Sequence, residues 1–315
     1  MDYRKEITDL NGFGQTAVTL GKFDGVHRGH KKLICRVLEK KAMGMETVLF
    51  AFGTSRHMLY TREERKEKLA SMGVDVLIDC PLDEHIRHMR AEDFVTQILV
   101  DRLHARYLAV GRDFRFGYER KGTPGLLQEM GDSLGFSVDI LDDEMDRGRK
   151  ISSTYVREQL NEGNIPKVNE LLGEVFSVSG EVLHGRGLGH RKLVPTTNLV
   201  PPREKLLPPN GVYVTISDFG GKRYRGITNI GYKPTVGGEE FIGVETYLFH
   251  CAENLYGRKS RVYFLEFLRA ERKFDSLEGL KEQLKKDIAK GMAYFERGLR
   301  SGKNRKADTL DPHDE

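Results

Sequence analysis

The sequence has little that would anchor it in a membrane or cross-link it outside the cell. Its apolar stretches are only a few residues long, far short of the ~20 residues of a membrane-spanning helix. The N-terminal residues are charged and no apolar segment follows them, so we expect no signal peptide. The three cysteines, Cys35, Cys80 and Cys251, are scattered and fit neither a disulfide framework nor a CxxC metal site. We therefore expect a cytoplasmic protein with no membrane partner.

Charge and glycine patterns exclude two further classes. The net charge is only +4 over 315 residues, and the basic residues alternate with acidic ones, so no polybasic arm indicates a nucleic-acid partner. No GxxxxGK[ST] segment occurs, which excludes P-loop kinase chemistry. The glycine-rich run 184–190 is not a GxGxxG fingerprint, because His190 takes the place of the last glycine. Hydrophobic residues make up 38% of the chain, enough for two domains with cores.

The first half alternates strand-like and helix-like segments. Apolar spacing predicts helices at 30–43, 62–72 and 94–103. Strand-like segments lie at 16–21, 47–52, 74–78, 107–110 and 136–141. This alternation is typical of a parallel sheet covered by helices on both faces, which binds ligands at its strand-to-helix loops.

The second half has a different pattern. Its strand-like segments are separated by Gly- and Pro-containing turns and lie at 175–183, 212–216, 224–230, 244–249 and 261–268. They predict a small antiparallel barrel or sandwich, followed by an amphipathic helix at 276–297. We predict an α/β domain at 1–173, an all-β domain with this C-terminal helix at 174–297, and a disordered polar tail at 298–315.

Two loops of the first half carry candidate chemistry. The segment Gly21 to His30 contains HxGH where a strand passes into a helix, and a helix N-terminus suits phosphate. His27 and His30 could donate to the oxygens of a nucleoside triphosphate. The segment Ile151 to Arg157 adds hydroxyls and a guanidinium at a second helix start. An ordinary capped helix would explain this serine loop alone, but the pair of loops indicates an anion site.

A second candidate site combines PTTN with a distant carboxylate. The hydroxyl of Thr196 and the amide oxygen of Asn198 are hard ligands that suit Mg²⁺ bridging phosphates. A capped Pro-Thr turn is the simpler interpretation of these residues alone. Glu245 lies among apolar neighbours in a strand-like segment, where a carboxylate is costly unless it faces a site. There it could act as general base towards a hydroxyl.

The first-half loops resemble the HxGH nucleotidylyltransferase superfamily. With Gly111–Gly117 and Arg62–Leu69, the first half is similar to the FMN adenylyltransferase module of bacterial bifunctional FAD synthetases. The resemblance implies that FMN phosphate attacks the α-phosphorus of ATP and releases pyrophosphate. It also implies catalytic roles for His27 and His30, and positions for Asp113 and Arg115 near flavin or nucleotide. The implied ATP-binding residues are Gly21, Phe23, Asp24, His27, His30, Ser153, Thr154 and Arg157.

The second half resembles riboflavin kinase. The matching segments follow the order of that family: 184–190, PTTN, 210–213, 229–235, 244–245, 255–257 and 273–277. The resemblance implies an antiparallel β-barrel, with flavin against it near the C-terminal helix. It implies that Glu245 activates the riboflavin 5′-hydroxyl for attack on the γ-phosphate, and that Thr196 and Asn198 bind Mg²⁺ and ATP. The implied further ATP contacts are Gly185, Gly187 and Gly189.

These observations predict a nucleotidylyltransferase-like α/β domain followed by a kinase barrel. The expected enzyme uses ATP and Mg²⁺ to convert riboflavin to FMN and FMN to FAD, as a monomer or weak homo-oligomer. Two departures from the family pattern are visible: residues 53–57 lack the family's prolines, and Leu193-Val194 replaces Gly-Phe before PTTN. The first leaves open a riboflavin kinase with a weak or inactive adenylyltransferase domain. A flavin-responsive regulatory or RNA-binding protein is the third interpretation, which the mixed charge disfavours.

Overall fold

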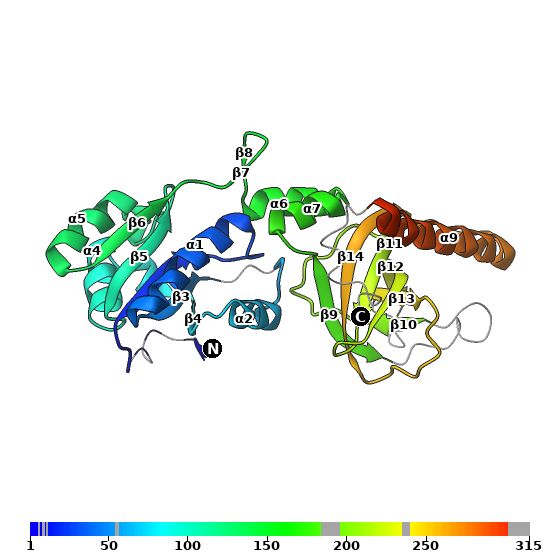
Figure 1. Cartoon of the computed structure of the whole chain (residues 1–315), viewed down its shortest axis with the longest axis horizontal. Helices are drawn as coiled ribbons and strands as arrows, with labels where there is room; N and C mark the ends of the chain where they lie inside the picture. Colours follow the sequence, from blue (N-terminus) through cyan, green and yellow to red (C-terminus); the bar gives the residue numbers. More distant parts are fainter. Residues whose placement is uncertain are drawn as a thin grey trace. The chain divides into compact units, whose positions relative to one another are not determined.

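The structure is a computed structural model that describes residues 1–301 apart from 6, 8, 9, 11, 54–56, 184–195 and 235–239. The chain divides into two compact units, Met1–Ser153 and Thr154–Glu315 (Figure 1). The predicted boundary at residue 173 stays a prediction. The predicted tail at 298–315 lies mostly outside the described residues, and the final helix continues to Ser301.

The first unit contains the predicted parallel sheet. Its sheet strands are β1 (Asp2–Arg4), β2 (Thr16–Gly21), β3 (Glu46–Phe52), β4 (Val76–Cys80), β5 (Ala105–Gly111) and β6 (Ser137–Leu141). They pair in the order β1-β4-β3-β2-β5-β6, all parallel. Strands β3 and β4 therefore lie on one side of β2 in the sheet, and strands β5 and β6 lie on the other side. This reversal at β2 is the switch point where such sheets bind ligands.

Helices and a small hairpin complete the first unit. The helices are α1 (Arg28–Leu38), η2 (Glu39–Met43), α2 (Arg62–Ser71), α3 (Glu84–His88), α4 (Ala91–Asp93), η3 (Phe94–Val100), η4 (Tyr118–Arg120) and α5 (Pro124–Leu134), and the hairpin pairs β7 (Met145–Asp146) with β8 (Arg149–Lys150). Both sheet faces are buried, since Val48 and Phe50 of β3 pack in one core while Leu49 and Ala51 pack in the other.

Two predicted helices differ in detail from the observed ones. The predicted helix at 30–43 is α1 followed by the 3-10 turn η2, which ends at Gly44 with a φ of 77°. The predicted helix at 94–103 is the π-helix η3, which ends at Val100, and the short α4 comes directly before it. Its apolar residues are buried as expected. Apolar spacing over so few turns does not distinguish the α-helical repeat of about 3.6 residues per turn from the wider π-helical repeat.

The second unit is a closed antiparallel barrel with helices beside it. The helices are α6 (Ser153–Asn161), whose first residue belongs to the first unit, α7 (Ile165–Leu172) and α9 (Leu277–Ser301). The strands are β9 (Ser177–Leu183), β10 (Thr197–Leu199), β11 (Gly211–Asp218), β12 (Arg223–Pro234), β13 (Glu240–Leu248) and β14 (Lys259–Ala270). They close in the order β10-β13-β12-β11-β14-β9, so the prediction of a barrel is confirmed.

The barrel strands present their two faces to different surroundings. Val212, Val214 and Ile216 of β11 share a core with Leu284 and Ile288 of α9. The alternating residues point the other way, where the hydroxyls of Thr215, Thr228 and Thr246 form a chain of hydrogen bonds of 2.7 and 2.8 Å. Tyr247 of β13 packs on the α9 side. Because side chains alternate along a strand, the residues two positions away from Tyr247 also face α9. Glu245 of β13 is among them.

Candidate active sites

The HxGH segment follows the loop after β2, at the switch point of the sheet, and its last three residues form the first turn of α1. His27 is the N-cap of α1, and its Nδ1 accepts a hydrogen bond from the backbone N–H of His30 at 3.4 Å. The two imidazoles are stacked, with ring centroids 3.7 Å apart. His27 is buried and His30 is half-buried, with its Nδ1 enclosed and without a hydrogen-bond partner among the described residues. The structure thus brings both predicted histidines to one helix N-terminus.

Both imidazoles are held in the neutral form at neutral pH. Burial, with the nearby ammonium of Lys150, lowers the pKa of His27 to about 4. Burial also holds the pKa of His30 well below its usual value, and the neighbouring His27 acts in the same direction. Neutral imidazoles add no positive charge of their own. The helix N-terminus and nearby cations must therefore supply the attraction for an anion.

The loop backbone before His27 is strained and tightly packed. Phe23 and Val26 have positive φ angles of 48° and 40°, a region that L-residues rarely adopt. Gly25 has a φ of 82°, and a Cβ there would lie 2.6 Å from Cδ1 of Leu59. The Asp24 carboxylate accepts from the backbone N–H of Leu59 at 2.9 Å. The loop is therefore fixed before any ligand binds, as a phosphate-binding loop requires.

The predicted ATP-binding residues of this unit have different surroundings. The ring of Phe23 is fully buried in the core, so a nucleotide could contact only its backbone. Asp24 is also buried, and its carbonyl accepts a hydrogen bond from Ser153 Oγ at 2.8 Å. The structure thus joins the histidine loop to the serine loop. Thr154 and Arg157 follow on α6 in the second unit, and their roles stay predictions.

A lysine that the sequence did not single out links the hairpin to Asp113. Lys150 Nζ lies 2.6 Å from the carboxylates of both Asp113 and Asp143, and its bond to Asp113 lowers the pKa of that carboxyl. Arg115 is exposed and donates to the carbonyl of Phe114 at 2.7 Å. Asp113 and Lys150 thus lie together, and the signal for Lys150 was its place just before the serine loop.

A small cavity of about 120 Å³ opens beside the histidine loop. Its lining includes Lys22, Asp24 and Arg65. Arg65 of α2 is almost fully buried and forms an ion pair of 2.7 Å with Asp79. Gly53 also lines this cavity, whereas residues 54–56 of the proline-free segment lie outside the described residues.

The second site forms where the short strand β10 meets β13. Thr196 Oγ1 donates a 2.6 Å hydrogen bond to Glu245 Oε1. Asn198 pairs in register with Glu245, and so does Asn229 from β12 on the other side. The Glu245 side chain is half-buried. Thr197 and Asn198 of PTTN therefore belong to a strand beside the candidate base, whereas Pro195 lies outside the described residues.

Two cavities meet at Thr196. One of about 270 Å³ lies between the barrel and α9, and its lining includes Glu245, Asn229, Tyr247, Phe274 and Leu284. The other, of about 320 Å³, is formed mainly by residues 251–256 with Thr196 and Thr197. Because Thr196 lines both, a group bound in one cavity can approach a group bound in the other beside Glu245.

Some predicted residues fall outside the structure, and some lining residues were not predicted. Gly185, Gly187 and Gly189 lie outside the described residues. Arg269, Arg272 and Asp287 line the cavity beside α9 without any motif to mark them. In the described part of the chain, no cluster of three or more His, Cys, Asp or Glu side chains is placed to hold a metal. None of the helices described there has the length and apolar character that crossing a membrane takes.

Comparison with known proteins supports both halves of this description. The family model for FAD synthetase matches residues 11–155, and the model for riboflavin kinase matches residues 172–295. A crystal structure of a macrolide-efflux protein from Streptococcus pneumoniae superimposes with a TM-score of 0.82 and 28% identity, covering 95% of this chain and 98% of that one. Both the first unit, called the sheet unit below, and the second unit, called the barrel unit below, thus have counterparts in known proteins.

Two relatives that are similar to this chain over most of its length have the same name. The bifunctional riboflavin kinase/FMN adenylyltransferase of Pseudomonas fluorescens is 35% identical over 285 residues, covering 87% of this chain and 91% of the relative. Its namesake from Escherichia coli strain K12 is 37% identical over 290 residues, covering 88% and 92%. The chain therefore belongs to the family of bifunctional riboflavin kinase/FMN adenylyltransferases.

Proposed function

We propose that the barrel unit phosphorylates riboflavin to FMN and that the sheet unit adenylylates FMN to FAD. The observation that carries the first assignment is the bond between Thr196 and Glu245 at the junction of two cavities. The stacked histidines at the N-terminus of α1 support the second. Matches of both family models support a chain with both activities, and nothing favours the kinase-only alternative.

In the kinase reaction Glu245 acts as the general base. Its carboxylate takes the proton of the riboflavin 5′-hydroxyl, whose oxygen attacks the γ-phosphorus of ATP. The bond from the γ-phosphorus to the bridging oxygen breaks, and ADP leaves. Thr196 holds Glu245 through its 2.6 Å hydrogen bond and orients the carboxylate before substrate arrives.

The oxygens of Thr196 and Asn198 fit a magnesium ion. Both are hard neutral donors, and the adjoining Glu245 carboxylate adds negative charge beside them. Bound there with ATP, Mg²⁺ would neutralise part of the phosphate charge. Gly185, Gly187 and Gly189 of the preceding loop are proposed as further ATP contacts.

In the adenylyl transfer, the FMN phosphate oxygen attacks the α-phosphorus of ATP and pyrophosphate leaves. His27 and His30 donate to phosphate oxygens as neutral imidazoles, and the free N–H groups at the start of α1 add to them. Gly21, Phe23 and Asp24 shape the loop, and Ser153 fixes it to the start of α6. We assign Thr154 and Arg157 to phosphate binding, and Asp113 and Arg115 to the flavin or nucleotide side.

Separating the two steps tests the proposal. Purified protein is incubated with riboflavin, ATP and Mg²⁺, and in parallel with FMN, and the flavins are resolved by chromatography. Glu245→Gln should abolish FMN formation and leave conversion of supplied FMN to FAD unchanged. His30→Ala should do the reverse. Equal loss of both steps in a folded variant, or FMN without FAD from the wild type, would overturn the two-site assignment.

The cellular setting follows from the same chemistry. We propose that the enzyme works in the cytoplasm on the small molecules riboflavin, FMN and ATP, as a monomer or weak homo-oligomer. Support comes from the cysteines, all of which are free thiols. Size-exclusion chromatography with light scattering measures the oligomeric state.

A further inference from the structure

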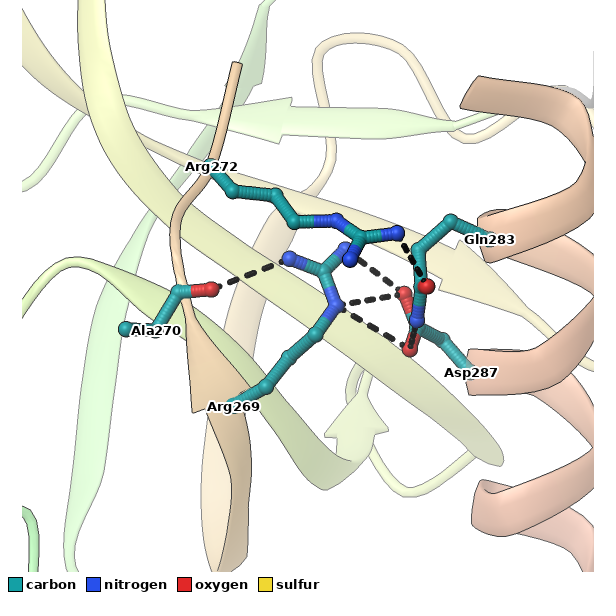
Figure 2. A network of polar contacts seen from close by, with 5 residues as sticks. All are labelled: Arg269, Ala270, Arg272, Gln283 and Asp287. Atoms are coloured by element: carbon teal, nitrogen blue, oxygen red, sulfur yellow. Dashed lines mark hydrogen bonds and ion pairs between the residues drawn. The ribbon is translucent and has the colours of Figure 1, made fainter. Parts of the chain in front are cut away.

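A buried ion pair joins the last barrel strand to the C-terminal helix. Asp287 of α9 is 1% exposed, and its carboxylate accepts hydrogen bonds from Arg269 of β14 (Figure 2). Arg269 Nε lies 3.0 and 3.1 Å from the two carboxylate oxygens, and Nη2 lies 2.7 Å from one of them. The remaining nitrogen, Nη1, donates to the carbonyl of Ala270 at 3.0 Å. Every nitrogen of this guanidinium therefore has a fixed partner.

A second arginine is held through the same helix. Gln283, one turn before Asp287 on α9, donates from Nε2 to Asp287 Oδ1 at 2.7 Å. Its amide oxygen accepts from Arg272 Nη2 at 2.5 Å, and Figure 2 shows the Arg272 side chain extending above Arg269 to reach it. The Arg272 guanidinium lies 4.7 Å from the ring centroid of Phe274. Asp287 thus fixes Arg269 directly and Arg272 through Gln283.

This network forms one wall of the cavity beside Glu245. Arg269, Arg272, Phe274 and Asp287 all line it, together with apolar residues of the barrel and of α9. The segment that joins β14 to α9 carries Arg272 and Phe274. The pair between β14 and α9 therefore holds both ends of the segment that borders the cavity.

Stability alone gives a weak reason for this arrangement. A buried ion pair costs desolvation, and well-packed apolar residues in its place are often as stable or more so. Its geometry nevertheless satisfies both carboxylate oxygens and presents a cation and an aromatic ring at the cavity. A planar heteroaromatic ring with carbonyl acceptors matches such a wall.

We propose that Asp287 is a positioning residue for the flavin, acting through Arg269 and through Gln283 to fix the wall against which the isoalloxazine ring binds. The inference rests on the proposed kinase function of the barrel unit. The hydrogen bonds of Asp287 go to Arg269 and Gln283, so we expect it to set flavin affinity and to leave the phosphoryl transfer itself unchanged. Because Asp287 Oδ2 accepts from Arg269 Nη2 and Oδ1 accepts from Gln283 Nε2, the single amide oxygen of Asp287→Asn leaves one of these donors without an acceptor.

The test compares Asp287→Asn with the wild type, each as the full chain. We expect the KM for riboflavin to rise ~10-fold or more, as loss of a charged hydrogen bond predicts. The kcat of FMN formation and the KM for ATP stay within about twofold. Glu282→Gln, an exposed carboxylate on the same helix, is the matched control and should leave all three unchanged.

A second variant separates positioning from folding. Replacing both partners, Arg269→Met with Asp287→Leu, removes the pair without leaving a buried charge, so the melting temperature should stay near that of the wild type. The KM for riboflavin should remain raised. A normal KM in this double variant, or equal loss of kcat and both KM values in Asp287→Asn, would overturn the inference.

A direct binding measurement distinguishes failure of the role proposed for Asp287 from failure of the proposed kinase function. Riboflavin fluorescence is titrated with each protein without ATP, and Asp287→Asn should bind ~10-fold or more weakly. A wild type that binds riboflavin but forms no FMN would refute the kinase assignment. A wild type that forms FMN, with unchanged binding in Asp287→Asn, would refute only the role of Asp287.

Discussion

Acid should destabilise the sheet unit through His27. Burial, with the charge of Lys150, lowers the pKa of this imidazole from 6.5 to about 4. Below pH 6.5 the unfolded chain therefore binds a proton that the folded chain does not bind until the pH reaches about 4. Because the unfolded state binds more protons in this window, the free energy of unfolding falls as the pH falls from 6.5 to 4. The pKa difference corresponds to about 3 kcal/mol.

The assay compares wild type with His27→Gln. Urea unfolding of the full chain is followed by circular dichroism between pH 4 and pH 7, and hydrogen exchange of β2 and α1 identifies the transition of the sheet unit. The variant should lose less stability on acidification, by about 2–3 kcal/mol. His30 acts in the same direction, so part of the pH dependence should remain.

A second histidine provides the control for this experiment. His85 is exposed on α3, and His85→Gln should unfold with the pH profile of the wild type. Parallel profiles for wild type and His27→Gln would refute the reasoning, because they would mean that His27 binds its proton equally well in the folded and unfolded states.

The remaining predictions concern the loop and the magnesium ligands. Gly25→Ala should lower the free energy of unfolding by ~1–3 kcal/mol in thermal unfolding, because residue 25 has a positive φ and the new Cβ would lie 2.6 Å from Leu59. Gly44 also has a positive φ but open space around it, so Gly44→Ala should lower the free energy of unfolding by less. Thr196→Val should lower FMN formation ~10-fold or more and leave FAD formation from FMN intact. Excess EDTA should stop both steps, and added Mg²⁺ should restore them; a metal-independent rate would contradict the magnesium proposal.

Much of the sheet unit could be predicted because its signals are local. The strand at 16–21 is apolar and ends at a glycine, and α1 follows it within a few residues. The sequence alone could thus place HxGH at a strand-to-helix loop. It could not predict the positive φ angles of Phe23 and Val26, since nothing in either residue type favours them. Asp24 and Gly25, which lie between these two residues, contact Leu59, a residue distant in sequence.

The cavity wall formed by Arg269 and Asp287 shows the limit of prediction from sequence. Arg269 and Asp287 are 18 positions apart on different elements, so no helical or strand spacing relates them. On the predicted helix, Asp287 follows Leu280 by seven positions and Leu284 by three, at the edge of the apolar stripe, and its side chain is 1% exposed. Only the packing of α9 on the barrel reveals that its charge is buried and paired.

The strand pairing that closes the barrel also brings together residues of the proposed kinase site. The three-residue strand β10 pairs with β9 on one side and with β13 on the other, and without it the barrel has two free edges. The pairing that closes the barrel is also the one that sets Asn198 opposite Glu245 and brings Thr196 to its carboxylate. So short a strand gives almost no periodic signal. A substitution that weakens β10 pairing should therefore reduce kinase activity before it unfolds the barrel, because the proposed general base and the proposed metal ligands separate first.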